Sequence, residues 1–193
     1  MKEYPNETIV FGLLVISFIF EIILSATWNK MYFTMGIPIL VLKLPVDRHY
    51  SNTPPLYRIQ KEIEGNWNVS VALKEFDTGV FGFSESTWTG ISHYTPIMHG
   101  LLLFDNENHQ VVVKGLPNIF FTVFSTVWLG SVIFFAPLLI KIGFTSFYAL
   151  VVGILYWIQY SRYKKVASFA TRAWLPLGLT QRAATVLKVK GKR

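Results

Sequence analysis

No acidic residue follows Glu107, and the remainder of the chain contains two long apolar runs, 118–140 and 142–160, followed by a basic tail. A helix that crosses the hydrocarbon core of a bilayer needs about 20 predominantly apolar residues. Both runs approach this length, and neither contains a charged side chain. This pattern constrains the fold more than any other feature, because it predicts a membrane protein and indicates on which side of the membrane the flanking segments lie.

A third apolar run, residues 9–28, contains one charged side chain, Glu21. We therefore predict three transmembrane helices, one in segment 1–28 and two that form a helical hairpin in 118–160. The composition agrees, since 52% of the residues are hydrophobic and only 15% are charged, against about a quarter charged in a globular domain. The absence of cysteine excludes disulfide frameworks and thiolate metal sites.

Lysine and arginine are concentrated after the third predicted helix, in the tail 161–193. These residues are Arg162, Lys164, Lys165, Arg172, Arg182, Lys188, Lys190, Lys192 and Arg193. The positive-inside rule places such a flank in the cytoplasm. Because a helical hairpin returns the chain to its starting side, we also expect segment 29–117 in the cytoplasm and the N-terminus outside. The expected location is a plasma membrane or a bacterial inner membrane.

The first apolar run has an alternative interpretation, a cleaved signal peptide with Ser25 and Ala26 near the cleavage site. The residues before it are poorly basic, and the run is longer than the apolar region of about 7 to 15 residues that is typical of signal peptides. Cleavage after export would also place the basic tail outside. We therefore favour the transmembrane interpretation.

Segment 29–117 is predicted to form a small antiparallel β-rich domain with one short helix, inserted between the first and second transmembrane helices. Alternating apolar and polar residues predict a strand at 67–74, and a turn at 77–79 leads into a returning strand at 80–85. Further expected elements are strands at 94–104 and 110–114, an edge strand or interfacial segment at 31–44, and a helix near 53–65. The predicted fold class is therefore membrane α+β.

The beginning of the tail is predicted to be an amphipathic helix, residues 162–174, that lies on the membrane surface. Its apolar arc consists of Tyr163, Val166, Phe169, Ala170, Ala173 and Trp174. The cations expected to bind anionic lipid headgroups or an acidic protein partner are Arg162, Lys164, Lys165 and Arg172. The simpler alternative is a charge cluster that only sets the topology. Nucleic acid is not an expected partner, because no aromatic stacking platform accompanies the charges.

Three apparent motifs do not predict chemistry. The triplet at 77–79 matches that of aspartic proteases, but it occurs once and fits a hairpin turn. The acidic loop at 105–116 lacks the glycine and the final glutamate of a calcium-binding loop. His93 and His99 would lie about 20 Å apart on one strand, which is too far for a shared metal ion. We therefore predict no catalytic residue, no metal site and no cofactor.

Glu21 is the candidate functional residue, because an ionisable group within a transmembrane helix is costly and marks a functional site by default. The hydroxyl groups at a matching depth in the other predicted helices belong to Ser125, Thr126 and Tyr156. We predict that Glu21 forms a hydrogen bond with one of them. This intramembrane polar cluster has two interpretations, a contact that holds helices together or a pathway for ions or protons.

Three functions are compatible with these observations. The first, which we favour, is a non-catalytic accessory or docking subunit that uses its cytoplasmic β domain and basic tail to bind a protein partner or a second copy of the chain. The second is a component of an oligomeric transporter or channel that involves Glu21. The third is a membrane-bound enzyme that acts on lipid, although no catalytic constellation is recognisable.

Overall fold

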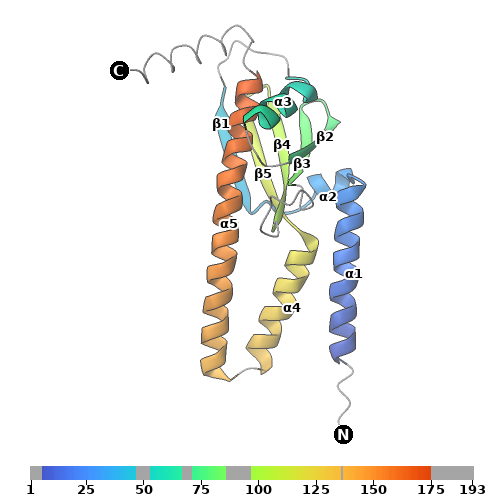
Figure 1. Cartoon of the computed structure of the whole chain (residues 1–193), viewed down its shortest axis with the longest axis vertical. Coiled ribbons are helices and arrows are strands. Elements are labelled where there is room, and N and C mark those ends of the chain that lie inside the picture. The colour runs from blue at the N-terminus through green and yellow to red at the C-terminus, as the bar shows by residue number, and fades with distance from the viewer. Residues whose placement is uncertain (1–5, 47–52, 67–70, 86–96, 136, 175–193) are drawn as a thin grey trace, which may run out of the picture.

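The computed structural model describes residues 6–46, 53–66, 71–85, 97–135 and 137–174. Figure 1 shows a β-sheet domain at one end of the molecule, from which long helices extend in the same direction. In chain order the elements are α1 (Asn6–Ala26), α2 (Lys30–Thr34), β1 (Leu40–Pro45), α3 (Leu56–Asn66), β2 (Val71–Asp77), β3 (Val80–Glu85), β4 (Met98–Asp105), β5 (Gln110–Pro117), α4 (Ile119–Phe135) and α5 (Leu138–Trp174). The predictions for 67–70, 94–96, His93 and 175–193 lie outside the described residues.

The five strands form one antiparallel sheet in the order β1-β5-β4-β3-β2. The links from β2 to β3 and from β4 to β5 are the two hairpins that the turn residues predicted. In the first turn Gly79 adopts a φ of +79°, a conformation that glycine allows at no steric cost. In the second, hydrogen bonds from Gln110 and Asn108 lower the pKa of Asp105 to about 2. The predicted small antiparallel β-rich domain is confirmed.

Segment 31–44 differs in part from the prediction. Its first residues belong to the short helix α2 rather than to an extended segment, because the side chain of Asn29 accepts a hydrogen bond from the Tyr32 amide at 3.3 Å and caps the helix. Phe33 of this helix is fully buried. The later residues form β1, which stands at one end of the strand order. The prediction of an edge strand is therefore confirmed for this part.

The last helix, α5, is one continuous helix of 37 residues. Its first half is apolar and largely exposed, whereas its buried residues begin at Gln159 and continue to Trp174. The separate membrane-surface helix predicted for 162–174 is therefore wrong, since the apolar arc of this segment packs against the sheet. An apolar helical arc fits any apolar surface, so the pattern alone did not distinguish a sheet from a bilayer.

Within the part of the chain that the structure describes, two helices are long and apolar enough to cross a membrane: α1, over Ile9–Ala26, and α5. The helix α4 has 17 residues and is shorter than the predicted run 118–140. It ends before Pro137, which fixes its own φ and cannot donate a backbone hydrogen bond. The boundary between the apolar runs 118–140 and 142–160 does not separate the two helices, because Lys141 already lies in α5 and its amide donates to the Pro137 carbonyl at 2.9 Å.

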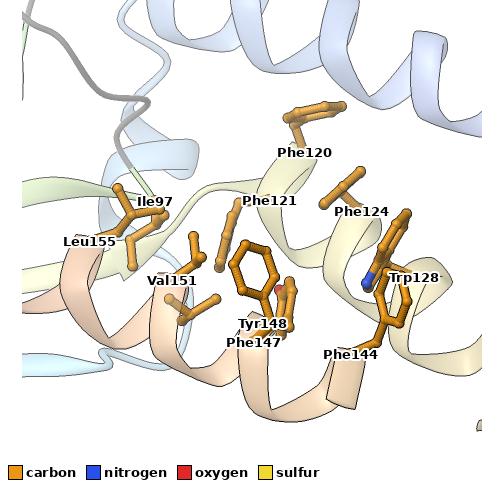
Figure 2. A pocket seen from close by; sticks show the side chains of 11 residues that line it. Ile97, Phe120, Phe121, Phe124, Trp128, Phe144, Phe147, Tyr148, Val151 and Leu155 are labelled. Carbon is orange, nitrogen blue, oxygen red and sulfur yellow. The ribbon is translucent and has the colours of Figure 1, made fainter. Parts of the chain in front are cut away.

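The helices α4 and α5 diverge from their short connection toward the sheet (Figure 1). A pocket of about 470 Å³ lies between them, and Figure 2 shows the side chains that line it. The first of these helices follows β5 directly along the chain. The second packs across one face of the sheet, where it contacts β1 and β5. The sheet therefore holds the two helices apart at one end, while the connection joins them at the other.

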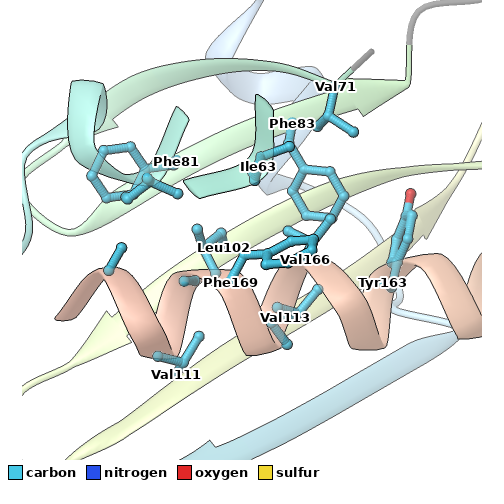
Figure 3. Packing of buried hydrophobic residues seen from close by; sticks show 14 of the residues in the cluster. Ile63, Val71, Phe81, Phe83, Leu102, Val111, Val113, Tyr163, Val166 and Phe169 are labelled. Carbon is cyan, nitrogen blue, oxygen red and sulfur yellow. The ribbon is translucent and has the colours of Figure 1, made fainter. Parts of the chain in front are cut away.

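The hydrophobic core lies between the sheet and the helices α3 and α5. Figure 3 shows Phe83 and Leu102 of the sheet close to Val166 and Phe169 of α5, with Ile63 of α3 beside them. These side chains are all at most 5% exposed. The second half of α5 is therefore part of the core of the β domain, and the orientation of this domain is fixed relative to the apolar half of the same helix.

Candidate functional site

Four polar side chains meet where α1, α2, β4 and the start of α4 come together. We call this cluster the polar junction; it consists of Glu21, Tyr32, His99 and Asn118. The Tyr32 hydroxyl donates a hydrogen bond to Glu21 Oε1, and its oxygen also lies 3.5 Å from Asn118 Oδ1. His99 Nδ1 lies 3.1 Å from the same Asn118 oxygen. The polar junction is therefore a continuous chain of polar contacts from α1 to the sheet.

The side chain of Glu21 caps the N-terminus of α4. Its Oε2 accepts hydrogen bonds from the backbone amides of Ile119 and Phe120, at 2.8 and 3.4 Å. The first amides of a helix have no acceptor within the helix, and the helix dipole favours a negative charge at this end. Each carboxylate oxygen of Glu21 thus has a donor, one from α2 and the other from α4.

Burial sets the protonation of the two rings in the polar junction. His99 is 5% exposed, and burial lowers its pKa below 6.5. Its Nε2 lies 2.9 Å from the Tyr32 carbonyl oxygen, so each ring nitrogen of His99 lies within hydrogen-bond distance of an oxygen. Burial and the neighbouring Glu21 raise the pKa of Tyr32, so its hydroxyl stays a donor. The two rings stack, with their centroids 4.0 Å apart.

The hydrogen bond predicted between Glu21 and a hydroxyl at matching depth is wrong. The hydroxyls that we predicted were those of Ser125, Thr126 and Tyr156. The Ser125 hydroxyl accepts a hydrogen bond from a tyrosine of α5, and the Thr126 hydroxyl donates to the backbone of α4. The Tyr156 hydroxyl donates at 3.4 Å to the carbonyl just before β1. Glu21 lies level with the first turn of α4, so at 1.5 Å per residue Ser125 is about 9 Å farther along the helix.

The sequence reasoning missed the true partners of Glu21. Tyr32 fell in a segment predicted to be extended, and His99 was considered only as a metal ligand. Asn118 offered a signal, because an asparagine directly before an apolar run is a typical helix N-cap residue. That signal marks the start of α4 correctly and also indicates which amides need an acceptor.

The four cations predicted to bind lipid or a partner lie in different environments. Arg162 forms an ion pair of 2.6 Å with Glu85, whose side chain is 2% exposed, so this arginine joins α5 to β3. The guanidinium of Arg172 lies 4.8 Å from the centre of a phenylalanine ring of its own helix. Lys164 and Lys165 are exposed. Arg172 is exposed as well, so three of the four predicted cations are accessible to a partner.

The pocket between α4 and α5 offers apolar surface and little else. Its walls include Phe121, Phe124, Trp128 and Leu155. The hydroxyl of Tyr148, which also lines the pocket, donates to a serine of α4. Among the described residues, no group of three or more His, Asp or Glu side chains could hold a metal ion. The pocket can therefore accept an apolar ligand, and its lining supplies no pair of acidic or basic groups.

No protein-family model, curated protein or solved structure matches the chain. The functional interpretation therefore rests on geometry. In that geometry the polar junction joins structural elements, and the pocket between α4 and α5 presents apolar walls.

Replacing Glu21 by alanine is expected to lower the free energy of unfolding by about 2 kcal/mol, because hydrogen bonds to a charged group contribute about 1.5 to 3 kcal/mol. Glu21→Gln keeps one acceptor oxygen and should lose about half as much. Tyr32→Phe removes a single donor and serves as the reference for one lost bond. Thermal unfolding in mild detergent measures all three variants. An unchanged midpoint for Glu21→Ala would rule out the capping role.

His99 is expected to make the protein less stable in mild acid. Since burial lowers its pKa in the folded state below 6.5, the unfolded chain binds more protons than the folded chain as the pH falls below this value. The stability that neutral His99 contributes is fully present above about pH 6.5 and is lost as the pH falls toward the folded-state pKa. Melting temperatures between about pH 7.5 and 5.5 should decline more steeply for the wild type than for His99→Gln. Parallel declines would contradict this expectation.

Proposed function

We propose that the chain is a non-catalytic membrane subunit whose β domain is held in a fixed orientation at the cytoplasmic membrane surface and docks a protein partner. The observation that carries this proposal is the continuity of α5. The same helix provides an apolar, exposed half that is long enough to cross a bilayer and a buried half that forms part of the β-domain core. A domain that is fixed in this way can serve as a docking platform more effectively than a domain that is attached by a flexible linker.

The polar junction supports the same proposal. Glu21 joins α1 to α2 and α4 at the level where the helices meet the sheet. The continuity of α5 is the first connection between the β domain and the apolar helices, and the contacts of Glu21 are the second. A transport role for Glu21 receives less support, because both of its carboxylate oxygens are occupied by donors of the protein itself.

We further propose three transmembrane helices, formed by α1, α4 and the first half of α5. The 17 residues of α4 extend over about 26 Å at 1.5 Å per residue, a few Å less than the average hydrocarbon thickness of about 30 Å, and local thinning of the bilayer accommodates a mismatch of this size. The basic residues that follow the apolar half of α5 favour a cytoplasmic location of the β domain under the positive-inside rule. The N-terminus and the α4–α5 connection would then face the opposite side.

Single cysteines are expected to label from opposite sides of the membrane, and the absence of native cysteine makes this measurement direct. Thr78→Cys and Lys164→Cys should react with an impermeant maleimide only after the cytoplasmic side is exposed. Leu138→Cys, at a side chain that is 74% exposed, should react in intact cells. Reaction of Thr78→Cys and Leu138→Cys from the same side would refute the proposed topology.

The docking surface that we propose is the free edge of β1. The other edge strand, β2, carries Lys74, Glu75 and Asp77, and charged residues protect an edge against pairing with another chain. By comparison, β1 carries a single charged residue, Lys43, and together with the residue before it exposes two apolar side chains, Ile39 and Val41, at 43% and 46%. An edge of this kind accepts an added strand through backbone hydrogen bonds.

A charge on β1 tests this surface. Affinity purification from mild detergent should recover a partner with the wild type and with Ala72→Asp, which places the same charge on the opposite edge strand. Val41→Asp should reduce recovery about tenfold, equivalent to about 1.4 kcal/mol of binding free energy. Unfolding midpoints of the two variants show whether both remain folded. Equal recovery with the two variants would exclude β1 as the docking edge.

A membrane enzyme that acts on lipid receives less support from the pocket between α4 and α5. Such an enzyme needs polar groups that converge on the reacting bond. The hydroxyl of Tyr148 is already engaged with Ser125, and the remaining lining is apolar except for the indole of Trp128. These features favour binding of an apolar group over chemistry upon it.

A further inference from the structure

We infer that the pocket between α4 and α5 binds one acyl chain of a bilayer phospholipid; this inference rests on the membrane location proposed above. The pocket has a volume of about 470 Å³, within the range of about 300 to 1,000 Å³ that is typical of ligand sites. Figure 2 shows aromatic side chains of α4 on one wall and apolar side chains of α5 on the other.

The topology of the chain maintains this pocket. The helix α4 leaves the sheet as the direct continuation of β5, whereas α5 crosses the face of the sheet. Hydrogen bonds from the backbone amides of Ile97 and Met98 to Gln159, at 3.0 and 3.1 Å, fix α5 at the wide end. At the narrow end the two helices are joined next to Pro137. The helices cannot close the gap along its whole length without detaching α5 from the core.

The chemistry of the lining selects hydrocarbon over water. Apolar cavities stay dry and accept apolar ligands, and the hydroxyl of Tyr148 has its partner in Ser125. An unfilled void would also deprive its walls of van der Waals contacts. An acyl chain supplies these contacts, and its flexibility allows it to follow a lining of staggered aromatic rings such as Phe124 and Trp128, whose centroids lie 5.9 Å apart.

The pocket is continuous with the apolar exterior of the helices. Three of its lining residues, Trp128, Phe144 and Phe147, are 40%, 47% and 65% exposed. The neighbouring outward-facing residues Ile154 and Trp157 of α5 are 50% and 69% exposed. A lipid at this surface can therefore place one chain between α4 and α5 without crossing any polar region, which commits the site to a lipid of the surrounding bilayer.

Photolabelling tests the inference. The full chain is reconstituted in phosphatidylcholine vesicles that contain a trace of the same lipid with a diazirine near the end of one acyl chain, and the labelled residues are mapped by mass spectrometry. We expect adducts on Phe121 and Tyr148 in the pocket as well as on Ile154 and Trp157. Val152→Trp places a larger side chain in the pocket and should reduce the pocket adducts about fivefold, because a filled interior leaves no room for an acyl chain. The outer adducts should stay unchanged.

Two further variants complete the test. Leu150→Trp, at a side chain that is 61% exposed and does not line the pocket, should leave the pocket adducts unchanged. Phe124→Ala enlarges the pocket and should increase labelling of Tyr148, so the inference stays testable if Val152→Trp does not fold. Outer adducts without pocket adducts would overturn the inference alone. Absence of both kinds of adduct would overturn the membrane location and the lipid site together.

Discussion

Replacing Gln159 by leucine is expected to lower the free energy of unfolding by about 2 to 6 kcal/mol, since each buried polar group left without a partner costs about 1 to 3 kcal/mol. The side chain of Gln159 is fully buried. Its Oε1 accepts from the amides of Ile97 and Met98, and its Nε2 donates to the Met98 carbonyl at 3.1 Å. The described pairing of β4 with β3 ends at Gly100, so beyond that point Gln159 takes the place of a neighbouring strand.

The loss should appear as a large decrease in the melting temperature in mild detergent and as faster proteolysis of the β domain. Two variants provide scale. Gln60→Leu makes the same exchange on the surface of α3 and should change stability by less than about 0.5 kcal/mol. Tyr163→Phe removes the other side-chain donor to the Met98 carbonyl, a bond of 3.0 Å, and should cost about 1 kcal/mol. A melting temperature equal to that of the wild type would show that Gln159 does not anchor α5.

The β domain was largely predictable from local pattern. Alternation of apolar and polar residues predicted the strand that corresponds to β2, and the turn residues at 77–79 and 105–108 predicted the hairpins that contain β3, β4 and β5. Their antiparallel pairing follows, because short turns join neighbouring strands. The helix α3 was predictable as well, since its first residues follow a proline pair and its apolar residues recur at helical spacing.

The path of α5 was not predictable in the same way. Gln159 and Tyr163 look like the end of a transmembrane run and the start of a basic tail, and nothing local indicates that the helix continues. Their partners lie about 60 residues earlier in the chain, as the separations of 61, 62 and 65 residues show. A pattern of nearby residues does not encode contacts of this range.

The candidate site shows the same limit. Glu21 was recognisable because a single carboxylate in an apolar helix needs a partner. Its actual partners are the Tyr32 hydroxyl and two backbone amides of α4. Backbone amides have no signature in side-chain chemistry, and only the asparagine at position 118 indicated where they would lie. A charged residue could therefore be predicted as important without its role as a helix cap being visible.

Gly100 occupies the position in the sheet where an added methyl group would do most damage. A Cβ atom there would lie 2.0 Å from Cζ of Phe83, which is the residue opposite it on β3. The Phe83 ring is fully buried, and its centroid lies 4.8 Å from that of Tyr163. The ring is thus held between the glycine backbone and Tyr163 of α5.

Gly100→Ala is therefore expected to cost about 3 kcal/mol, the upper part of the range for overpacked cores. Gly130→Ala is the matched control, because a Cβ on that residue of α4 would meet no atom within 4 Å. There the substitution should stabilise the helix by up to about 1 kcal/mol. Melting temperatures in mild detergent should consequently shift in opposite directions for the two variants. A decrease of similar size in the melting temperatures of both variants would show that contact with Phe83 is not the reason why alanine is poorly tolerated. It would also contradict the inference that α5 holds this ring against the sheet.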